Sequence, residues 1–240
     1  MLKEFLDAIL KMQPPTLSTQ NGITYTDKTM TAIVDPIQPC ESVSTLQGFA
    51  DLVGSKKLNQ AHRTQFPGYV IVDDHRTVQL LDFEMDTWGR RNKHVQADLE
   101  SDLKGFPYEH FMGVETFVIA LMSLFEATPD RDAIVKLVSK ITEEDIRISE
   151  DDGISQSVTV KSSTALKTTE TVKRIVTLAP YRTFREVPQP QSQFVFRVRK
   201  TEQGPTCALF EADGGRWRLD AVANIKAWLQ AKLPNDTIIA

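Results

Sequence analysis

Residues 111–125 read FMGVETFVIALMSLF, and Thr128-Pro129-Asp130 follows them closely. The stretch is apolar on nearly every side when it is wound as a helix, which is typical of a helix buried on most of its surface. It is too short to span a bilayer, so we expect a central core helix or an oligomer interface. The Thr-Pro-Asp sequence predicts the end of this helix and the start of a second one over 131–141. Together they predict a buried helical hairpin.

Strand patterns flank this hairpin on both sides. Residues 73–76 form a polar turn between two alternating stretches, which is a strong hairpin signal. No regular alternation of strands and helices appears, so the predicted class is α+β, with antiparallel sheets and segregated helices. We expect strands over 69–72, 77–86, 94–99, 146–148, 155–161, 172–178, 194–199 and 206–210, and a hairpin within 23–34 that turns at Asp27-Lys28.

Three further helices are predicted, over 2–12, 44–53 and 216–233. The last one is amphipathic and has two apolar faces at 100° per residue. The wider face suits the chain's own sheet and carries Leu219, Val222, Ile225, Leu229 and Leu233. The opposite face carries Trp217, Ala221 and Trp228. The two indoles therefore need cover, from a second internal layer or from another subunit.

The chain is long enough for one large core or two small ones, at 240 residues and 41% hydrophobic composition. We expect a single α+β domain over 1–240, with a subdivision into 1–142 and 143–240 as the alternative. The Ser/Thr-rich residues 162–171 are interpreted as a flexible loop or a long hairpin tip. Residues 186–192 contain Pro188 and Pro190, so they are interpreted as an extended arm that reaches a neighbouring subunit.

The formal net charge of −4 conceals an uneven distribution of charge. Residues 82–152 hold seventeen Asp and Glu against eight Lys and Arg, a balance of −9. Residues 173–200 hold seven basic residues against Glu186 alone, a balance of +6. Complementary patches of this kind serve either a polyanionic partner or head-to-tail self-association.

The best candidates for catalysis are Asp82, Glu84 and Asp86, because alternate carboxylates on a strand share one face and could hold Mg²⁺. A solvated strand face is the competing interpretation. The four histidines lie far apart without metal-ligand spacing, and Cys40 and Cys207 are expected as reduced thiols. No Walker, dinucleotide or nucleophile-elbow motif occurs. We therefore expect a non-catalytic protein without metal or cofactor.

Two basic features could bind anions. Asp213-Gly214-Gly215 precedes Arg216 and Arg218 at a predicted helix start, which suits either an anion site or an ordinary turn. Further upstream, four arginines are interleaved with Tyr181, Phe184, Phe194 and Phe196, a composition that fits nucleic-acid binding or an electrostatic subunit contact. Phe194 and Phe196 share one strand face, so they are also expected in the core. The four arginines are Arg182, Arg185, Arg197 and Arg199.

Two runs resemble a known family. Residues 176–197 read VTLAPYRTFREVPQPQSQFVFR, and residues 208–222 read ALFEADGGRWRLDAV. These runs, with GVETF at 113–117 and Asp130-Arg-Asp132, resemble the YfdQ-like phage and prophage proteins, a family of unknown function. The resemblance implies a tailed-phage or prophage gene expressed in a bacterial cytoplasm, and it carries no catalytic residues over.

The leading functional hypothesis is a homo-oligomeric phage accessory protein that self-assembles into a ring or shell, with Trp217, Trp228, Pro188 and Pro190 at the interface. The alternative is a nucleic-acid-binding accessory in phage DNA metabolism or counter-defence, which uses the four arginines. A host protein is a further candidate partner. The chain lacks an apolar run of the roughly 18 residues that a membrane span needs. Its amphipathic start does not resemble a signal peptide, so a cytoplasmic location is expected.

Overall fold

The computed structural model describes residues 3–6, 12, 14–20, 23–26, 39–55, 68–86, 89–100, 105–139, 146–151, 155–161, 167–202 and 204–240. The chain divides into two compact units, Met1–Ile37 and Gln38–Ala240. The larger unit combines helices with mostly antiparallel sheets, which confirms the predicted α+β class. It contains two separate hydrophobic cores, which are named below by their sheets.

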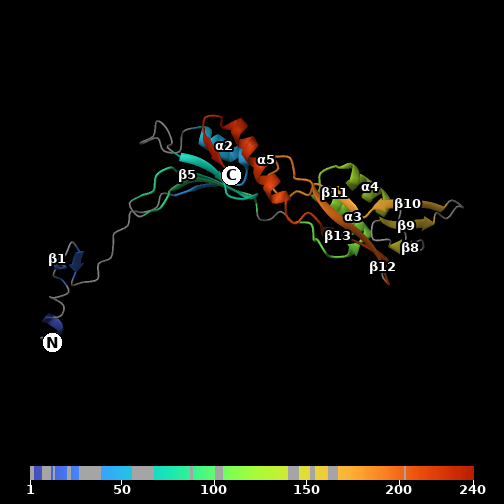
Figure 1. Ribbon diagram of the computed structural model, residues 1–240, viewed down its shortest axis with the longest axis horizontal. Helices are drawn as coiled ribbons and strands as arrows, with labels where there is room; N and C mark the ends of the chain where they lie inside the picture. Colours follow the sequence, from blue (N-terminus) through green and yellow to red (C-terminus); the bar gives the residue numbers. More distant parts are fainter. Residues whose placement is uncertain are drawn as a thin grey trace. The chain divides into compact units, whose positions relative to one another are not determined.

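The five-stranded sheet has the order β14-β4-β5-β6-β3. The strands β4, β5 and β6 are antiparallel, whereas both edge strands are parallel to their neighbours. The helices α2 (Leu46–Gly54) and α5 (Trp217–Lys232) pack beside it, as Figure 1 shows. Its strands are β3 (Glu41–Val43), β4 (Gly68–Val72), β5 (Thr77–Asp82), β6 (Lys93–Asp98) and β14 (Thr237–Ile239).

The four-stranded sheet has the order β11-β12-β13-β7, and all its pairings are antiparallel. The helices α3 (Val114–Leu124) and α4 (Pro129–Val138) cover one face of it. On that face Phe194, Phe196 and Val198 are buried, as period-two alternation requires of a half-buried strand. Its strands are β7 (Met112–Gly113), β11 (Ile175–Leu178), β12 (Ser192–Thr201) and β13 (Gly204–Glu211).

A three-stranded antiparallel sheet contains β8 (Ile146–Asp151), β9 (Ser155–Lys161) and β10 (Lys167–Lys173). The hairpin interpretation of 162–171 is confirmed in part, because β10 begins within that stretch and pairs with β9. The predicted strand over 172–178 is divided at Arg174 between β10 and β11.

In the small unit, β1 (Leu17–Gln20) pairs with β2 (Ile23–Thr26). The turn predicted at Asp27-Lys28 lies outside the described residues, as does the rest of that hairpin beyond Thr26. The hairpin that the structure describes comes earlier in the chain and pairs Gln20 with Ile23. Residues 3–6 and 12 are helical, and the rest of the helix predicted over 2–12 lies outside the described residues.

Helix caps follow the expected chemistry. The hydroxyl of Thr128 accepts a hydrogen bond from the Arg131 backbone N–H at 3.2 Å, with Pro129 in the first turn of α4. The helix predicted to open at Ser44 is capped one residue later, by Thr45.

Within a single chain the first helix of the hairpin is not buried on most sides, so its interpretation as a central core helix is wrong, while the alternative of an oligomer interface stays a prediction. Phe117 and Leu121 are fully buried under α3, but Ile119 and Met122 are 60% and 61% exposed. The reason is geometric: α3 lies on one face of a sheet, so only one of its sides meets the core.

The predicted apolar faces of the last helix also need correction. Leu219 is 74% exposed, whereas Trp217, Ala221, Ile225 and Leu229 are buried at intervals of four residues along α5. A stripe of this spacing drifts around a helix, so α5 meets different partners along its length. Trp217 lies at its start, and Leu229 belongs to the core of the five-stranded sheet.

Both cores draw residues from either side of position 142. The core of the four-stranded sheet joins Phe117 and Leu121 with Phe194 and Leu209. The core of the five-stranded sheet joins strands β4–β6 with α5 and with Phe184 and Val187. In sequence order, the chain first contributes strands β4–β6 to the core of the five-stranded sheet and then forms most of the core of the four-stranded sheet. Residues 184–187 and α5 contribute to the core of the five-stranded sheet again.

Candidate nucleic-acid interface

The four-stranded sheet has a second face, which points away from α3 and α4 and is called the outer face here. On β12 the residues Val195, Arg197 and Arg199 alternate with the buried Phe196 and Val198, so they lie on this face. Arg199 is exposed and Arg197 is half-buried.

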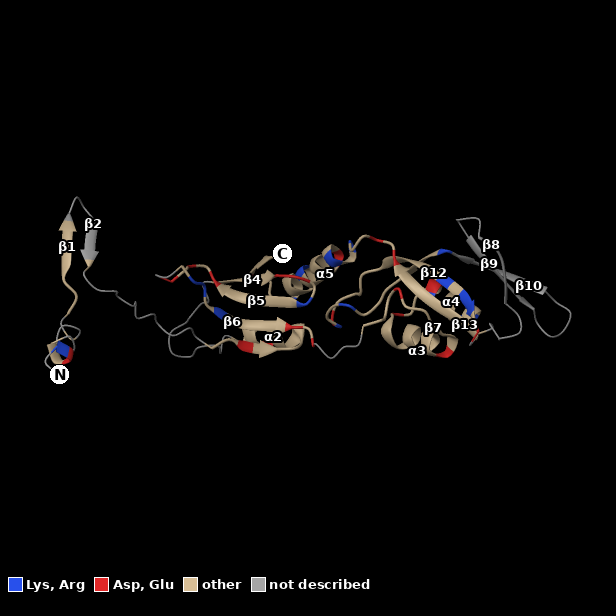
Figure 2. Ribbon diagram, turned by 90° about the horizontal axis from the view of Figure 1, so that it is seen from below, with Lys and Arg blue, Asp and Glu red and all other residues tan. Residues whose placement is uncertain are grey.

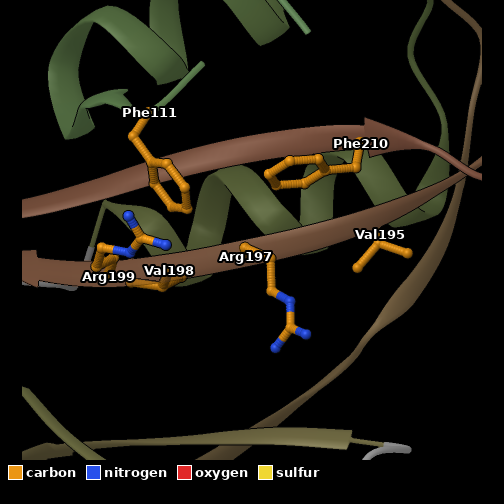
Figure 3. A pocket seen from close by; sticks show the side chains of 6 residues that line it. All are labelled: Phe111, Val195, Arg197, Val198, Arg199 and Phe210. Atoms are coloured by element: carbon orange, nitrogen blue, oxygen red, sulfur yellow. The ribbon is translucent and has the colours of Figure 1, made fainter. Parts of the chain in front are cut away.

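A hollow of about 480 Å³ lies on the outer face (Figure 3). The rings of Phe111 and Phe210 meet edge to face with centroids 6.1 Å apart. The guanidinium carbon of Arg199 lies 4.2 Å from the centroid of the Phe111 ring. Figure 3 shows the Arg197 side chain extending away from the two strands. The hollow is lined by Phe111, Val195, Arg197, Val198, Arg199 and Phe210.

This arrangement combines the two chemistries that single-stranded nucleic acids need. Guanidinium groups bind phosphate oxygens through charge-assisted hydrogen bonds. Aromatic rings offer a surface on which bases stack. Phe210 lies directly opposite Val195 in the strand pairing, so these two side chains are neighbours on the outer face.

The four predicted arginines do not form one surface. Arg182 is largely buried, with its guanidinium carbon 4.5 Å from the centroid of the Trp217 ring and 5.1 Å from those of Tyr108 and Phe194. It pairs with Glu211 at 2.9 Å. Burial raises the pKa of Tyr108 to about 12, although the nearby Arg182 opposes this. Arg182 therefore sits in an internal aromatic cluster.

Arg185 is exposed and stacks on Tyr181, with its guanidinium carbon 3.7 Å from the centroid of the tyrosine ring. It is not among the residues that line the hollow, so only Arg197 and Arg199 of the predicted set are brought together there.

The residues predicted at an oligomer interface lie in different surroundings. Trp217 is 5% exposed and its ring meets the His75 ring edge to face at 4.8 Å, so the chain itself covers this indole. Trp228 is half-buried against the core of the five-stranded sheet.

The proline segment is held by its own chain at several points. Pro190 is buried, while Pro188 is exposed and its carbonyl oxygen accepts a hydrogen bond from the Asn224 side chain at 2.9 Å. The buried amide of Gln189 donates to the Phe184 carbonyl oxygen at 2.9 Å. These contacts explain the extended course of the segment without a neighbouring subunit.

The predicted acidic face on 77–86 is wrong. Val78 and Leu80 point into the core, and Asp82 lies on the same side of β5 and is buried too. Phe83 and Met85, which were expected on the apolar side, are exposed. The Asp82 carboxylate meets His94 Nε2 at 2.7 Å, and Asp86 binds Arg90. The strand ends at Asp82, so the three acids do not converge.

Metal-ligating residues are likewise dispersed. Within the described ranges, no group of three or more His, Cys, Asp or Glu side chains could hold a metal ion. Nδ1 of His110 lies 2.8 Å from the carbonyl oxygen of Tyr108, and His62 lies outside the described residues.

In the turn that precedes α5, the carboxylate of Asp213 binds a backbone N–H of the same turn. The Asp213 carboxylate accepts a hydrogen bond from the Gly215 backbone N–H at 3.0 Å. Gly214 and Gly215 have φ values of 64° and 81°, which favour glycine at both positions. The predicted anion site at these N–H groups is therefore already occupied by Asp213.

Sequence reasoning missed the two aromatic residues of the hollow. It chose Tyr181, Phe184, Phe194 and Phe196. The three phenylalanines are buried, and Tyr181 contacts Arg185. Phe210 could have been found from the register of the hairpin 192–211, because it faces Val195. Phe111 could not, since its place depends on the pairing of β7 with β13.

Comparisons with known proteins identify no relative. No protein-family model matches the chain, no curated protein matches it, and no solved structure matches it. Among the described residues, no helix is both long enough and apolar enough to cross a membrane.

Proposed function

We propose that this protein binds single-stranded nucleic acid on the outer face of the four-stranded sheet. The observation that supports this proposal is the convergence of Arg197 and Arg199 with Phe111 and Phe210 on one hollow. The arginines bind phosphates and the rings stack on bases, a combination that tolerates many sequences.

The acidic net charge of the chain does not oppose this function, because binding depends on the local field. The segment 173–200, which includes β12 as far as Lys200, has a balance of +6, although Arg182 within it is paired with Glu211. Phosphate contacts from this segment make affinity depend on salt concentration.

The test is fluorescence anisotropy with a labelled single-stranded oligonucleotide over a range of salt concentrations. Affinity should fall with salt by a slope of about −0.7 per phosphate contact in a log–log plot. The double variant Arg197→Ala/Arg199→Ala should weaken binding and flatten the slope by about 1.4. Arg185→Ala is the matched control, because this exposed arginine lies outside the hollow. Equal binding by the double variant and the wild type would refute the proposal.

A second candidate function is self-association, and the small unit favours it. Every described side chain within residues 1–37 is exposed, including Phe5 at 65%, Leu6 at 52% and Leu17 at 60%. An isolated two-stranded hairpin and a short helix are marginal in water without a packing partner. We propose that a second copy of the chain covers these side chains, and that Ile119 and Met122 on α3 contribute to the receiving surface.

Light scattering at low and high salt tests this second proposal on the full chain. The double variant Phe5→Asp/Leu6→Asp should lower the native mass, because charge on the apolar side opposes its burial. Lys3→Glu is the control for charge alone, since Lys3 is exposed and polar. A monomeric wild type, or an unchanged mass in the double variant, would count against self-association.

The biological setting is also a proposal. The resemblance of residues 176–197 and 208–222 to YfdQ-like proteins supports a non-catalytic accessory role in a phage or prophage, in the bacterial cytoplasm. Binding of single-stranded nucleic acid would suit phage DNA metabolism. Expression of the gene during prophage induction is the measurement that tests this setting.

A further inference from the structure

A second pocket, of about 460 Å³, lies where α5 begins and is called the Trp217 pocket here. It adjoins the outer face, because Thr177 and Gln193 pair across β11 and β12 and both line it. Gln193 precedes Val195 by two residues on the same strand face, so the pocket and the hollow follow one another along β12. The lining residues are Thr177, Gln191, Ser192, Gln193, Ala212, Asp213, Arg216, Trp217 and Asp220.

One polar atom of this pocket, Nε1 of Trp217, is buried and has no hydrogen-bond partner among the described residues. Trp217 is only 5% exposed. Buried polar groups are nearly always paired in folded proteins, so this N–H indicates an acceptor that the chain does not supply. The Ser192 hydroxyl and the Asp213 carboxylate line the same pocket and hydrogen-bond to each other. The pocket therefore offers one fixed donor together with the remaining lone pairs of a carboxylate.

The charged residues that line the pocket are Asp213, Arg216 and Asp220. Burial alone raises the pKa of Asp213, but hydrogen bonds from Ser192 and from the backbone, with the positive charge of Arg182, bring it below its ordinary value. Asp213 is therefore ionised at neutral pH. Arg182 does not line the pocket and is paired with Glu211. Two carboxylates against one guanidinium group disfavour an anion, so a neutral group with hydrogen-bond donors suits the site better.

We propose that the Trp217 pocket binds a nucleobase. The edge of a base presents hydrogen-bond donors and acceptors side by side. An acceptor on that edge would receive the indole N–H of Trp217, and an N–H of the base would donate to Oδ2 of Asp213. This inference extends the proposed nucleic-acid function, since Arg197 and Arg199 lie further along β12, where they would hold the phosphates of a strand whose base enters the pocket.

The test is calorimetric titration of the full chain with the four ribonucleoside 5′-monophosphates, and with ribose 5-phosphate as the base-free control. At least one nucleotide should bind saturably, and ribose 5-phosphate should not. Trp217→Phe keeps a ring but removes the indole N–H, so it should weaken nucleotide binding about fivefold. Trp228→Phe is the matched control, because Trp228 packs against the other core and should leave binding unchanged.

Asp213→Asn provides a second variant in case Trp217→Phe unfolds the protein, which circular dichroism would reveal. It keeps one oxygen for the Gly215 N–H but replaces the other carboxylate oxygen by an amide donor, so it too should weaken binding. Absence of binding by all four nucleotides would overturn the inference, as would equal affinity in both pocket variants and the wild type.

Oligonucleotide titrations separate this inference from the proposal on which it rests. If oligonucleotides bind and Arg197→Ala/Arg199→Ala abolishes that binding, but mononucleotides do not bind, the pocket inference fails and the nucleic-acid proposal stands. If both bind, an oligonucleotide affinity that exceeds the mononucleotide affinity and depends on Arg199 identifies a base within a strand. Equal affinities that do not depend on Arg199 identify a free nucleotide as the ligand, and the nucleic-acid proposal then fails.

Discussion

At the residue scale, His75 connects the turn between β4 and β5 with the aromatic cluster of Arg182. Its ring meets Trp217, and its carbonyl oxygen accepts a hydrogen bond from the Thr183 hydroxyl at 2.6 Å. Burial lowers the pKa of His75 below its ordinary 6.5, and Arg218, Arg76 and Arg182 lower it further, while Asp74 opposes them. The imidazole is therefore neutral in the folded protein at neutral pH.

This shift predicts acid sensitivity. The unfolded chain binds the proton more tightly, so the stabilisation is fully present above pH 6.5 and is lost as pH falls below it toward the folded pKa. The midpoint of urea unfolding should be lower at pH 5.5 than at pH 7.5. His75→Gln should reduce this difference, and an identical pH dependence in the variant would show that His75 does not contribute.

The two cysteines should differ in reactivity. Burial raises the pKa of Cys207 to about 12 and leaves its side chain without solvent contact, so its thiolate is scarce and inaccessible. Cys40 is exposed, although partial burial raises its pKa too. A thiol reagent at pH 8 should modify one cysteine in the native protein and two in guanidinium chloride. Rapid modification of both in the native state would contradict the buried position of Cys207.

At the scale of single elements, α3 shows how position on a sheet overrides sequence pattern. Its residues are apolar almost all round, yet Leu121 is fully buried while Met122 is 61% exposed. The exposed side is the part of α3 that we assign to self-association.

The neighbouring pair Leu121 and Met122 provides a matched test. Leu121→Ala should destabilise the protein by about 2–5 kcal/mol, because it leaves a cavity in the core of the four-stranded sheet. Met122→Ala should change the free energy of unfolding by less than about 0.5 kcal/mol at low protein concentration. Urea unfolding measures both values, and similar losses would mean that Met122 is also buried.

At the scale of the whole molecule, the larger unit has two cores that share one chain. Residues 184–187 and α5 belong to the core of the five-stranded sheet, although they follow helices α3 and α4 of the other core in the sequence. The connecting helix α5 carries the basic residues Arg218, Lys226 and Lys232 and one acidic residue, Asp220; its coloured positions are visible in Figure 2. Because the connections are discontinuous in sequence, a cut at 142/143 would divide both cores.

Self-association makes a prediction at this scale. If residues 1–37 dock on a second copy, the Tm of the full chain should rise with protein concentration, because assembly stabilises the folded state by mass action. The Tm of Phe5→Asp/Leu6→Asp should not depend on concentration. A wild-type Tm that is constant over a hundredfold range of concentration would contradict the proposed docking.

The sequence by itself determined the local elements and the fold class. Turn residues at 73–76, the Thr128 cap and the alternation of Phe194 and Phe196 act over a few residues, so their signals can be read directly. Tertiary structure alone decided what covers each apolar face. Trp217, for example, contacts His75 and Arg182, which are far from each other in the sequence. It also placed Phe111 beside Arg199, through the pairing of β7 with β13. Such contacts depend on packing between distant segments, because periodicity identifies an apolar side without identifying its partner.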